Sequence, residues 1–160
     1  MENMKETVQR DQSALAPEIH PLIEDFQVLY QSLNRDTLSK VNMASVYHER
    51  VVFEDCFHHI DGLDDLFSYF KSLYENVEAI QFEFHEVCTN QSTAILNWTM
   101  TYQHPSLNKG QPIKVEGASK LVVQDDRIIS HRDYFDAGNL LYEHIPVLKN
   151  VIRFLKRRMS

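Results

Sequence analysis

Asp133 is the residue whose type and position best fit acid–base chemistry in this sequence. It lies in the run from Ile128 to Asp136, which predicts a strand. Strand alternation puts four residues on one face: Ile129, His131, Asp133 and Phe135. Because two of them are apolar, we expect this face to point into the interior, with His131 beside Asp133. A carboxylate in apolar surroundings can act as a general base, although a buried Asp held by Arg, His or Tyr for structural reasons is the alternative.

Aromatic and methionine side chains would form an apolar wall around these groups. Along residues 93–103, Trp98, Met100 and Tyr102 alternate with polar residues. Such a lining suits a flat or flexible apolar ligand, whereas the alternative is a filled hydrophobic core. The expected ligand-binding residues are Phe53, Phe82, Phe84, Trp98, Met100, Tyr102 and Phe135, with His58 at the mouth as a proton shuttle or a solvated loop residue.

The sequence supports metal, cofactor and thiol chemistry less well than acid–base chemistry. His58 and His59 would point to opposite sides of an extended chain, so they do not form a simple metal site. Cys56 and Cys88 fit no metal spacing and no disulfide framework, and neither has a basic neighbour that would activate a thiolate. The sequence has no glycine-rich phosphate loop. We therefore predict no metal and no cofactor.

Composition indicates one ordinary domain. The chain has 160 residues, of which 43% are hydrophobic and 11% aromatic, and this excludes a disordered chain. It has no apolar run long enough to span a membrane and no apolar N-terminal signal segment. The net charge of −7 argues against a broad nucleic-acid surface. With only two cysteines, we expect a reduced, cytoplasmic protein.

The elements that must position these residues follow from periodicity. Apolar spacing of three and four predicts helices, and the pattern changes to strict alternation after residue 77. Pro17 fits the first turn of the first helix, Asp36 or Thr37 a cap of the second, and Asp61 a cap of the third. The expected elements are a frayed lead at 1–16, helices at 17–33, 36–47 and 62–74, a short strand at 51–55, a loop at 56–60, and strands at 78–88, 93–103, 112–123 and 127–135.

Helices that precede strands predict a segregated α+β fold. Each long strand has one dry and one wet face, which is typical of an antiparallel meander covered on one side. We expect a cone-shaped curved antiparallel sheet packed on three N-terminal helices, with a C-terminal helical tail. The mouth of such a cone is a natural ligand site.

Residues 146–160 form the predicted tail, a basic amphipathic helix. The segment Lys149–Arg158 carries five basic residues and no acidic one. It could contact nucleic acid, an anionic membrane or an acidic partner. We expect instead that its apolar stripe docks on the body and that its basic edge stays in water.

Three phrases resemble the nuclear-transport-factor-2-like superfamily, and within it the SnoaL-like group: Val52–Asp55, Val115–Gly117 and, most specifically, Ile128–Asp136. The group borders the ketosteroid isomerases and the limonene-epoxide hydrolases. The resemblance covers residues 17–145 and implies a cone-shaped α+β domain, a homodimer and an internal pocket. It does not fix an activity, because this fold hosts enzymes, ligand binders and interaction modules.

The resemblance also gives Asp55 a role. Asp55 ends a phrase similar to the strand that carries the general base in ketosteroid isomerases, so it would face Asp133 across the pocket and share acid and base roles. The alternative is a loop-capping carboxylate. The chain departs from both enzyme patterns: the helix tyrosine of the isomerases falls at Leu29, one residue from Tyr30, and the epoxide-hydrolase Arg-x-Asp pair is missing from Asn97–Thr101.

Our leading hypothesis is a protein that binds a small apolar molecule, carbonyl-containing or polycyclic, and isomerises, cyclises or hydrates it through Asp133, His131 and Asp55. The alternatives are a noncatalytic ligand-binding or regulatory module and an interaction protein with a filled core.

Overall fold

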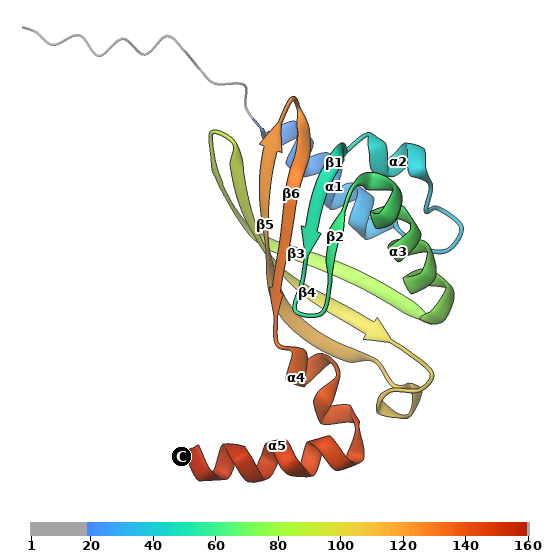
Figure 1. Ribbon diagram of the computed structural model, residues 1–160, viewed down its shortest axis with the longest axis vertical. Coiled ribbons are helices and arrows are strands. Elements are labelled where there is room, and N and C mark those ends of the chain that lie inside the picture. The colour runs from blue at the N-terminus through green and yellow to red at the C-terminus, as the bar shows by residue number, and fades with distance from the viewer. Residues whose placement is uncertain (1–18, 160) are drawn as a thin grey trace, which may run out of the picture.

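A six-stranded curved sheet organises residues 19–159, the part of the chain that this computed structural model describes (Figure 1). The strand order is β2-β1-β6-β5-β4-β3. The strands are β1 Tyr47–Glu54, β2 His59–Asp61, β3 Ala79–Asn90, β4 Thr93–Gln103, β5 Ile113–Gln124 and β6 Arg127–Phe135. The helices are α1 His20–Ser32, α2 Lys40–Ala44, α3 Leu63–Asn76, α4 Ala137–Leu140 and α5 Pro146–Met159, with short 3-10 turns η1 Asn108–Gly110 and η2 Tyr142–His144.

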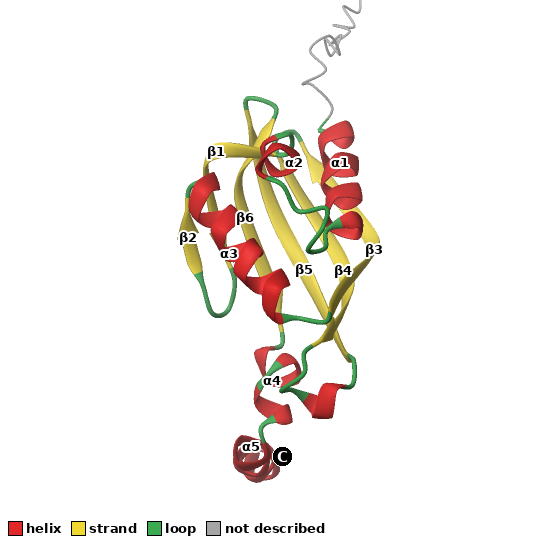
Figure 2. Cartoon of the chain, turned by 90° about the vertical axis from the view of Figure 1, so that its right-hand side faces the viewer, coloured by secondary structure: helices red, strands yellow, loops and turns green. Residues whose placement is uncertain are grey.

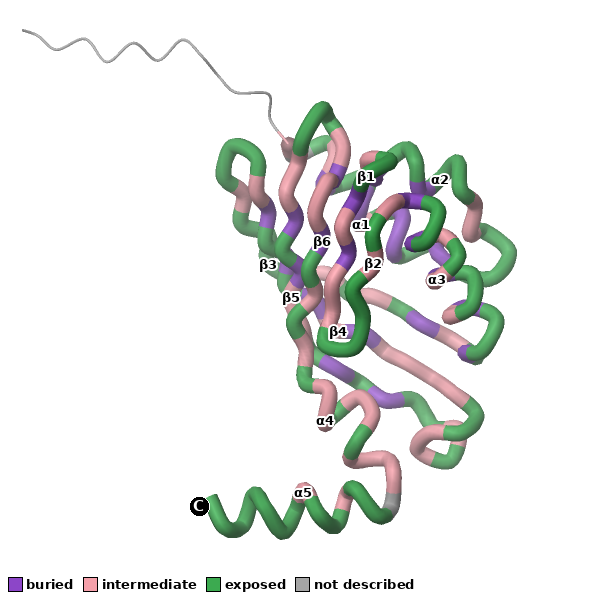
Figure 3. Tube along the Cα trace, viewed as in Figure 1, coloured by how far each residue is buried: buried purple, intermediate pink, exposed green. Residues whose placement is uncertain are grey.

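The expected α+β class is confirmed, and so is the packing of the N-terminal helices on one face of a curved sheet (Figure 2). Strands β3 to β6 form the expected antiparallel meander. Each inner face is apolar because alternate residues are buried, as in Ala94, Leu96 and Trp98 of β4. The buried residues gather between the sheet and the helices (Figure 3).

The first strand differs from its prediction. We expected a short strand from Val51, but β1 begins at Tyr47 and runs parallel to β6, so the sheet is not purely antiparallel. The β-branched residues Val51 and Val52 indicated only the second half of β1. The strand begins earlier, at Tyr47, whose ring is buried in the core. The expected loop at 56–60 was also wrong in part, since His59–Asp61 form β2 and pair with β1.

The second helix is shorter than predicted. Asn34 Oδ1 accepts hydrogen bonds from the backbone N–H groups of Asp36 and Thr37, which holds these residues in a turn. Ser39 then caps α2 by accepting from the backbone N–H of Asn42. The cap therefore falls three residues after Asp36.

Helices α1 and α3 also begin at other residues than predicted. Helix α1 begins at His20 with a proline in its first turn, and Pro17, like the lead at 1–16, lies outside the described residues. Helix α3 begins after Gly62, whose φ of 89° favours glycine. Asp61 therefore does not cap α3; its carboxylate lies 3.4 Å from the ring of His59.

A bulge in β6 decides which of its residues face inward. Val122 pairs with Ser130, but Val123 pairs with Ile128, so Ile129 is an extra residue in the ladder. Ile128 is consequently fully buried, which corrects the prediction that Ile129 faces the interior. Beyond the bulge, His131 is buried and alternates with exposed Arg132, as predicted.

The tail does not dock on the body as expected. Helix α5 extends away from the sheet beyond α4 and η2 (Figure 1). Most of its apolar residues are exposed, including Val147 and Phe154. Across residues 19–159, none of the helices has both the length and the apolar character needed to cross a bilayer.

Gly117 of β5 makes room for the largest ring in the core. Its Cα pairs with that of Trp98 on β4, and a Cβ at this position would overlap the indole ring. The ring is rigid and 2% exposed, so it has little space to move. Glycine here lets the indole lie flat across β5.

We predict that Gly117→Ala destabilises the protein by about 1–3 kcal/mol, because it overpacks the core at Trp98. The free energy of unfolding in urea measures this change. Glu116→Ala is the matched control on the exposed outer face of the same strand, with an expected change within about 0.5 kcal/mol. Equal effects of the two substitutions would contradict the packing argument.

Candidate functional site

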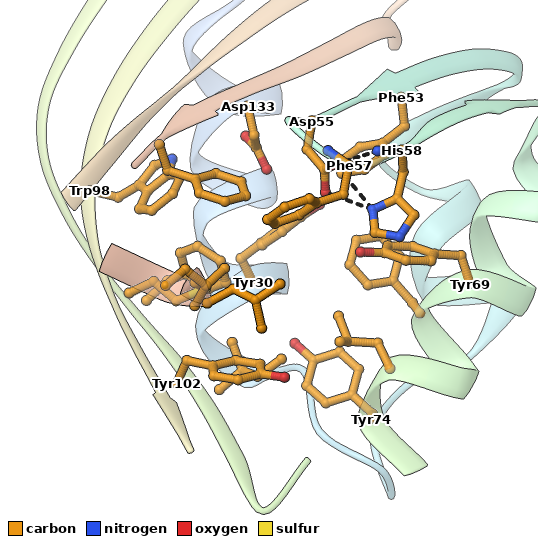
Figure 4. A pocket seen from close by; sticks show the side chains of 18 of the residues that line it. Tyr30, Phe53, Asp55, Phe57, His58, Tyr69, Tyr74, Trp98, Tyr102 and Asp133 are labelled. Atoms are coloured by element: carbon orange, nitrogen blue, oxygen red, sulfur yellow. Dashed lines mark hydrogen bonds and ion pairs between the residues drawn. The ribbon is translucent and has the colours of Figure 1, made fainter. Parts of the chain in front are cut away.

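A cavity of about 370 Å³ lies between the concave face of the sheet and helices α1 and α3 (Figure 4). This size suits a small organic ligand. Its lining is mainly apolar, and Lys and Arg are absent from it among the described residues. The predicted residues that line it are Phe53, Asp55, His58, Phe82, Trp98, Met100, Tyr102, Asp133 and Phe135.

Two predicted residues lie elsewhere. Phe84 does not line the cavity, because its ring packs against Phe26 on α1 and stacks on Phe82. His131 does not line it either: its side chain is fully buried, and the rings of Phe26 and Phe53 contact it edge-on. His131 therefore reaches the cavity only through its contact with Asp133.

Asp133 presents one carboxylate oxygen to the protein and the other to the cavity. Oδ1 accepts hydrogen bonds from Ser119 Oγ at 2.5 Å and from His131 Nε2 at 2.8 Å. Oδ2 has no hydrogen-bond partner among the described residues. The side chain is 12% exposed and lines the cavity. The carboxylate is thus oriented by one oxygen and left available at the other.

The histidine connects this carboxylate to two buried tyrosines. Tyr47 Oη lies 2.7 Å from His131 Nδ1, and Tyr30 Oη lies 2.7 Å from Tyr47 Oη. With His131 neutral and its proton on Nε2, Tyr30 donates to Tyr47, Tyr47 donates to Nδ1, and Nε2–H donates to Asp133. Burial, followed by nearby negative charge, raises the pKa of Tyr30. Burial also raises the pKa of Tyr47, so both tyrosines remain protonated donors at neutral pH.

Trp98 approaches Asp133 from the neighbouring strands. Its Nε1–H donates to Ser119 Oγ at 2.9 Å, and the Ser119 hydroxyl in turn donates a hydrogen bond to Asp133 Oδ1. Ser119 is 2% exposed, so these bonds are shielded from water. The position of the indole and the orientation of the carboxylate therefore depend on each other.

Asp55 lines the same cavity but is engaged by its own turn. Its Oδ1 accepts from the backbone N–H groups of Phe57 and His58, each at 2.7 Å. The His58 ring lies 3.0 Å from Oδ1 and 3.2 Å from Oδ2. This geometry is that of the loop cap considered above, and it holds the β1–β2 turn at the cavity wall.

Tyr69 and Tyr74 were missed by the sequence analysis as ligand contacts, whereas Tyr102 was predicted. Tyr69 and Tyr74 on α3 and Tyr102 on β4 line the cavity, and their hydroxyls lack hydrogen-bond partners among the described residues (Figure 4). Burial raises the pKa of each, so each remains a neutral donor at neutral pH. The sequence analysis predicted only a helix at 62–74 here, and no sequence signal distinguished these hydroxyls.

The cavity thus combines a carboxylate oxygen with hydroxyl donors in a mainly apolar space. Asp133 Oδ2 can accept a proton, and the tyrosine hydroxyls can hydrogen-bond an oxygen that gains negative charge. Within residues 19–159, no group of three or more His, Cys, Asp or Glu side chains is arranged to hold a metal ion.

Comparison with known proteins identifies the family of this chain. The sequence matches the SnoaL-like domain over residues 26–131. This match runs from α1 into β6, where it ends at His131, and it covers most of the cavity lining. The chain belongs to the SnoaL-like domain family. Comparison with curated proteins finds no significant match.

Solved structures share the fold of this SnoaL-like domain at low identity. A protein provisionally described as a SnoaL-like polyketide cyclase from Jannaschia sp. CCS1 is 12% identical, with a TM-score of 0.70 over 82% of this chain and 96% of that chain. An epoxide hydrolase of the LEH-like type from M. tuberculosis is 17% identical, with a TM-score of 0.63 over 84% and 94%. A protein with a ketosteroid isomerase-like fold from Catenulispora acidiphila, solved with trimethylamine, is 12% identical, with a TM-score of 0.64 over 81% and 93%.

These structures share the fold, and they do not transfer an activity at such identities. The family match confirms the resemblance to the SnoaL-like group, and the three structures confirm the predicted fold.

We predict that Tyr47→Phe destabilises the SnoaL-like domain by about 1–3 kcal/mol, because it leaves buried Nδ1 of His131 without its nearest donor. The ring itself is retained, so packing changes little. Urea unfolding measures the loss.

Tyr134→Phe is the matched control for this prediction. The Tyr134 ring is 51% exposed on the outer face of β6, so we expect a change within about 0.5 kcal/mol. A Tyr47→Phe effect as small as that of the control would show that the buried hydroxyl network does not stabilise the fold.

Proposed function

We propose that the SnoaL-like domain binds a small, mainly apolar carbonyl compound and that Asp133 removes a proton from the carbon next to the carbonyl. The observation that carries this proposal is the division of the Asp133 carboxylate, whose Oδ1 is fixed by Ser119 and His131 while Oδ2 faces the cavity without a partner among the described residues. A base held in this way is ready before the ligand arrives.

The first step transfers the proton to Asp133 Oδ2. The electrons of the broken C–H bond move toward the carbonyl oxygen and give an enolate, whose oxygen accepts a hydrogen bond from a cavity tyrosine. Tyr69, Tyr74 and Tyr102 are the candidates, since each presents a hydroxyl to the same cavity. Their raised pKa values keep them protonated for this role.

The second step returns the enolate to a neutral product. If Asp133 gives the proton back to a different carbon, the substrate is isomerised. If the enolate carbon attacks a second carbonyl of the same molecule, a C–C bond closes a ring and the electron pair of that carbonyl's π bond moves to its oxygen, which then takes the proton from Asp133. The substrate decides between these outcomes, because Asp133 supplies the same proton transfer to both.

Several features of the site support a flat substrate. Trp98 and Phe82 meet edge to face on one wall, with ring centroids 5.3 Å apart, and Phe53 and Phe70 contact each other on another. Aromatic walls favour planar ring systems. The polyketide cyclase description of one structural neighbour points in the same direction for this chain.

Binding without turnover is the second candidate. The described cavity lining lacks Lys and Arg, so an enolate oxygen would be stabilised by neutral hydroxyls alone. Electrostatic stabilisation of developing charge is commonly the largest single catalytic contribution. A cavity with weaker stabilisation is better suited to holding a ligand than to converting it.

Hydrogen–deuterium exchange of the bicyclic ketone 2-tetralone tests the chemistry. We predict that the protein accelerates loss of the ketone's α-proton NMR signal in D₂O and that Asp133→Asn lowers this acceleration at least about 100-fold, as expected for removal of a general base. Glu116→Gln, a carboxylate on the outer face of β5, is the matched control and should exchange like the parent.

Trp98 fluorescence separates the two candidates, since Trp98 is the single tryptophan of the sequence and lines the cavity. Quenching by 2-tetralone with Asp133-dependent exchange supports the enzyme. Quenching without accelerated exchange supports the binding module. If 2-tetralone causes no quenching and no accelerated exchange, both candidates are contradicted for this ligand class.

A further inference from the structure

Helix α5 leaves an apolar side uncovered. Phe154 is 59% exposed, Leu155 is 52% exposed and Val147 is 73% exposed. Within the described chain, α5 contacts chiefly η2, and Lys156 donates to Glu143 of η2 at 2.5 Å. The exposed apolar residues of α5 are Val147, Leu148, Val151, Phe154, Leu155 and Met159. A continuous apolar strip of this kind on an otherwise folded protein marks an interaction surface.

The opposite side of the same helix is basic. At 100° per residue, the apolar residues share one side of α5 and four basic residues share the other: Lys149, Arg153, Lys156 and Arg157. Arg158 lies at the apolar side near the end, where its guanidinium is 6.0 Å from the centre of the Phe154 ring. The sequence from 147 to 160 contains no acidic residue.

We propose that α5 binds the surface of an anionic lipid bilayer, lying in the plane of the interface. The apolar side then enters the boundary between headgroups and acyl chains, and the basic side faces lipid phosphates. Arg158 can extend its charged end back to the headgroups while its stem stays among apolar groups.

Charge complementarity supports an anionic bilayer as the partner of α5, and the apolar side of the helix decides against the acidic body of a second copy. The chain as a whole carries −7 although α5 is basic, so an anionic surface attracts α5 and repels the rest. Such a helix must stand clear of the acidic body, as α5 does in Figure 1. A second copy offers a poorer fit, because its groove formed by 31–36 and 74–81 exposes mainly polar atoms.

Nucleic acid would satisfy only one side of the helix. Phosphates could pair with the basic residues, but the apolar side would remain in water. Lipid is the partner that covers both sides at once.

Docking through α5 would bring the cavity toward the bilayer. Helix α4 and η2 connect α5 to the domain, and Leu140 and Leu141 line the cavity. The ring of Tyr142 in η2 contacts Phe57 of the cavity wall edge to face. The docking proposal does not depend on what the cavity binds, since vesicles alone test it.

Co-sedimentation of the full chain with vesicles tests the proposal. We expect binding to vesicles of phosphatidylcholine with phosphatidylglycerol, weak or no binding to phosphatidylcholine alone, and weaker binding as salt rises. Phe154→Ser with Leu155→Ser should lower the affinity at least about tenfold by removing apolar contacts, and Lys149→Gln with Arg153→Gln should do the same by removing charge.

Matched controls lie on other helices. Val41→Ser removes an apolar side chain that is 78% exposed on α2, and Lys71→Gln removes an exposed charge on α3; neither should change binding. Circular dichroism melting checks that each variant folds like the parent.

Three results would overturn the proposal. The first is no sedimentation with anionic vesicles. The second is binding that the α5 variants leave unchanged, or that neutral vesicles match. The third is evidence for another partner: full displacement from vesicles by duplex DNA, or a dimer in analytical ultracentrifugation. Such a dimer contradicts the proposal if it fails to bind vesicles and if Phe154→Ser with Leu155→Ser converts it to a monomer.

Discussion

The two hydrogen bonds to Oδ1 of Asp133 are the constraint on which the site depends. Ser119 and His131 hold one oxygen, so the other must face the cavity. Two further hydrogen bonds fix these donors in place: Trp98 donates to Ser119, and Tyr47 donates to His131. Without these donors a carboxylate in an apolar wall would lack both orientation and compensation for its lost hydration.

Strands β4, β5 and β6 contribute to this arrangement, and two of them need a local irregularity or a small residue. The bulge at Ile129 sets the phase of β6 so that His131 and Asp133 face inward. Gly117 on β5 leaves space for the indole of Trp98 on β4. The curved sheet and α3 then enclose the cavity, and Tyr69 and Tyr74 of α3 add two hydroxyls to its polar groups. Packing and chemistry are therefore coupled through Trp98, which belongs to both.

Much of the fold could be predicted because long strands with one dry face leave a clear alternating pattern, as in β3 to β6. The phase of Asp133 was also predictable, since Phe135 is apolar and near it. The bulge was not, because alternation cannot show an extra residue in a ladder. The parallel strand β1, the position of Phe84 and the places of Tyr69 and Tyr74 in the cavity were missed as well, since contacts between distant segments decide them. The exposure of α5 contradicted an expectation drawn from amphipathicity alone, which shows a stripe but not what covers it.

A crystal structure of the protein with 2-tetralone bound tests the central claim most directly. The account requires the ketone inside the cavity, with its α-carbon within about 3.5 Å of Asp133 Oδ2 and its oxygen near a tyrosine hydroxyl. Coordinates in which packed rings fill the cavity, or in which Asp133 turns both oxygens away from the ketone, would contradict it.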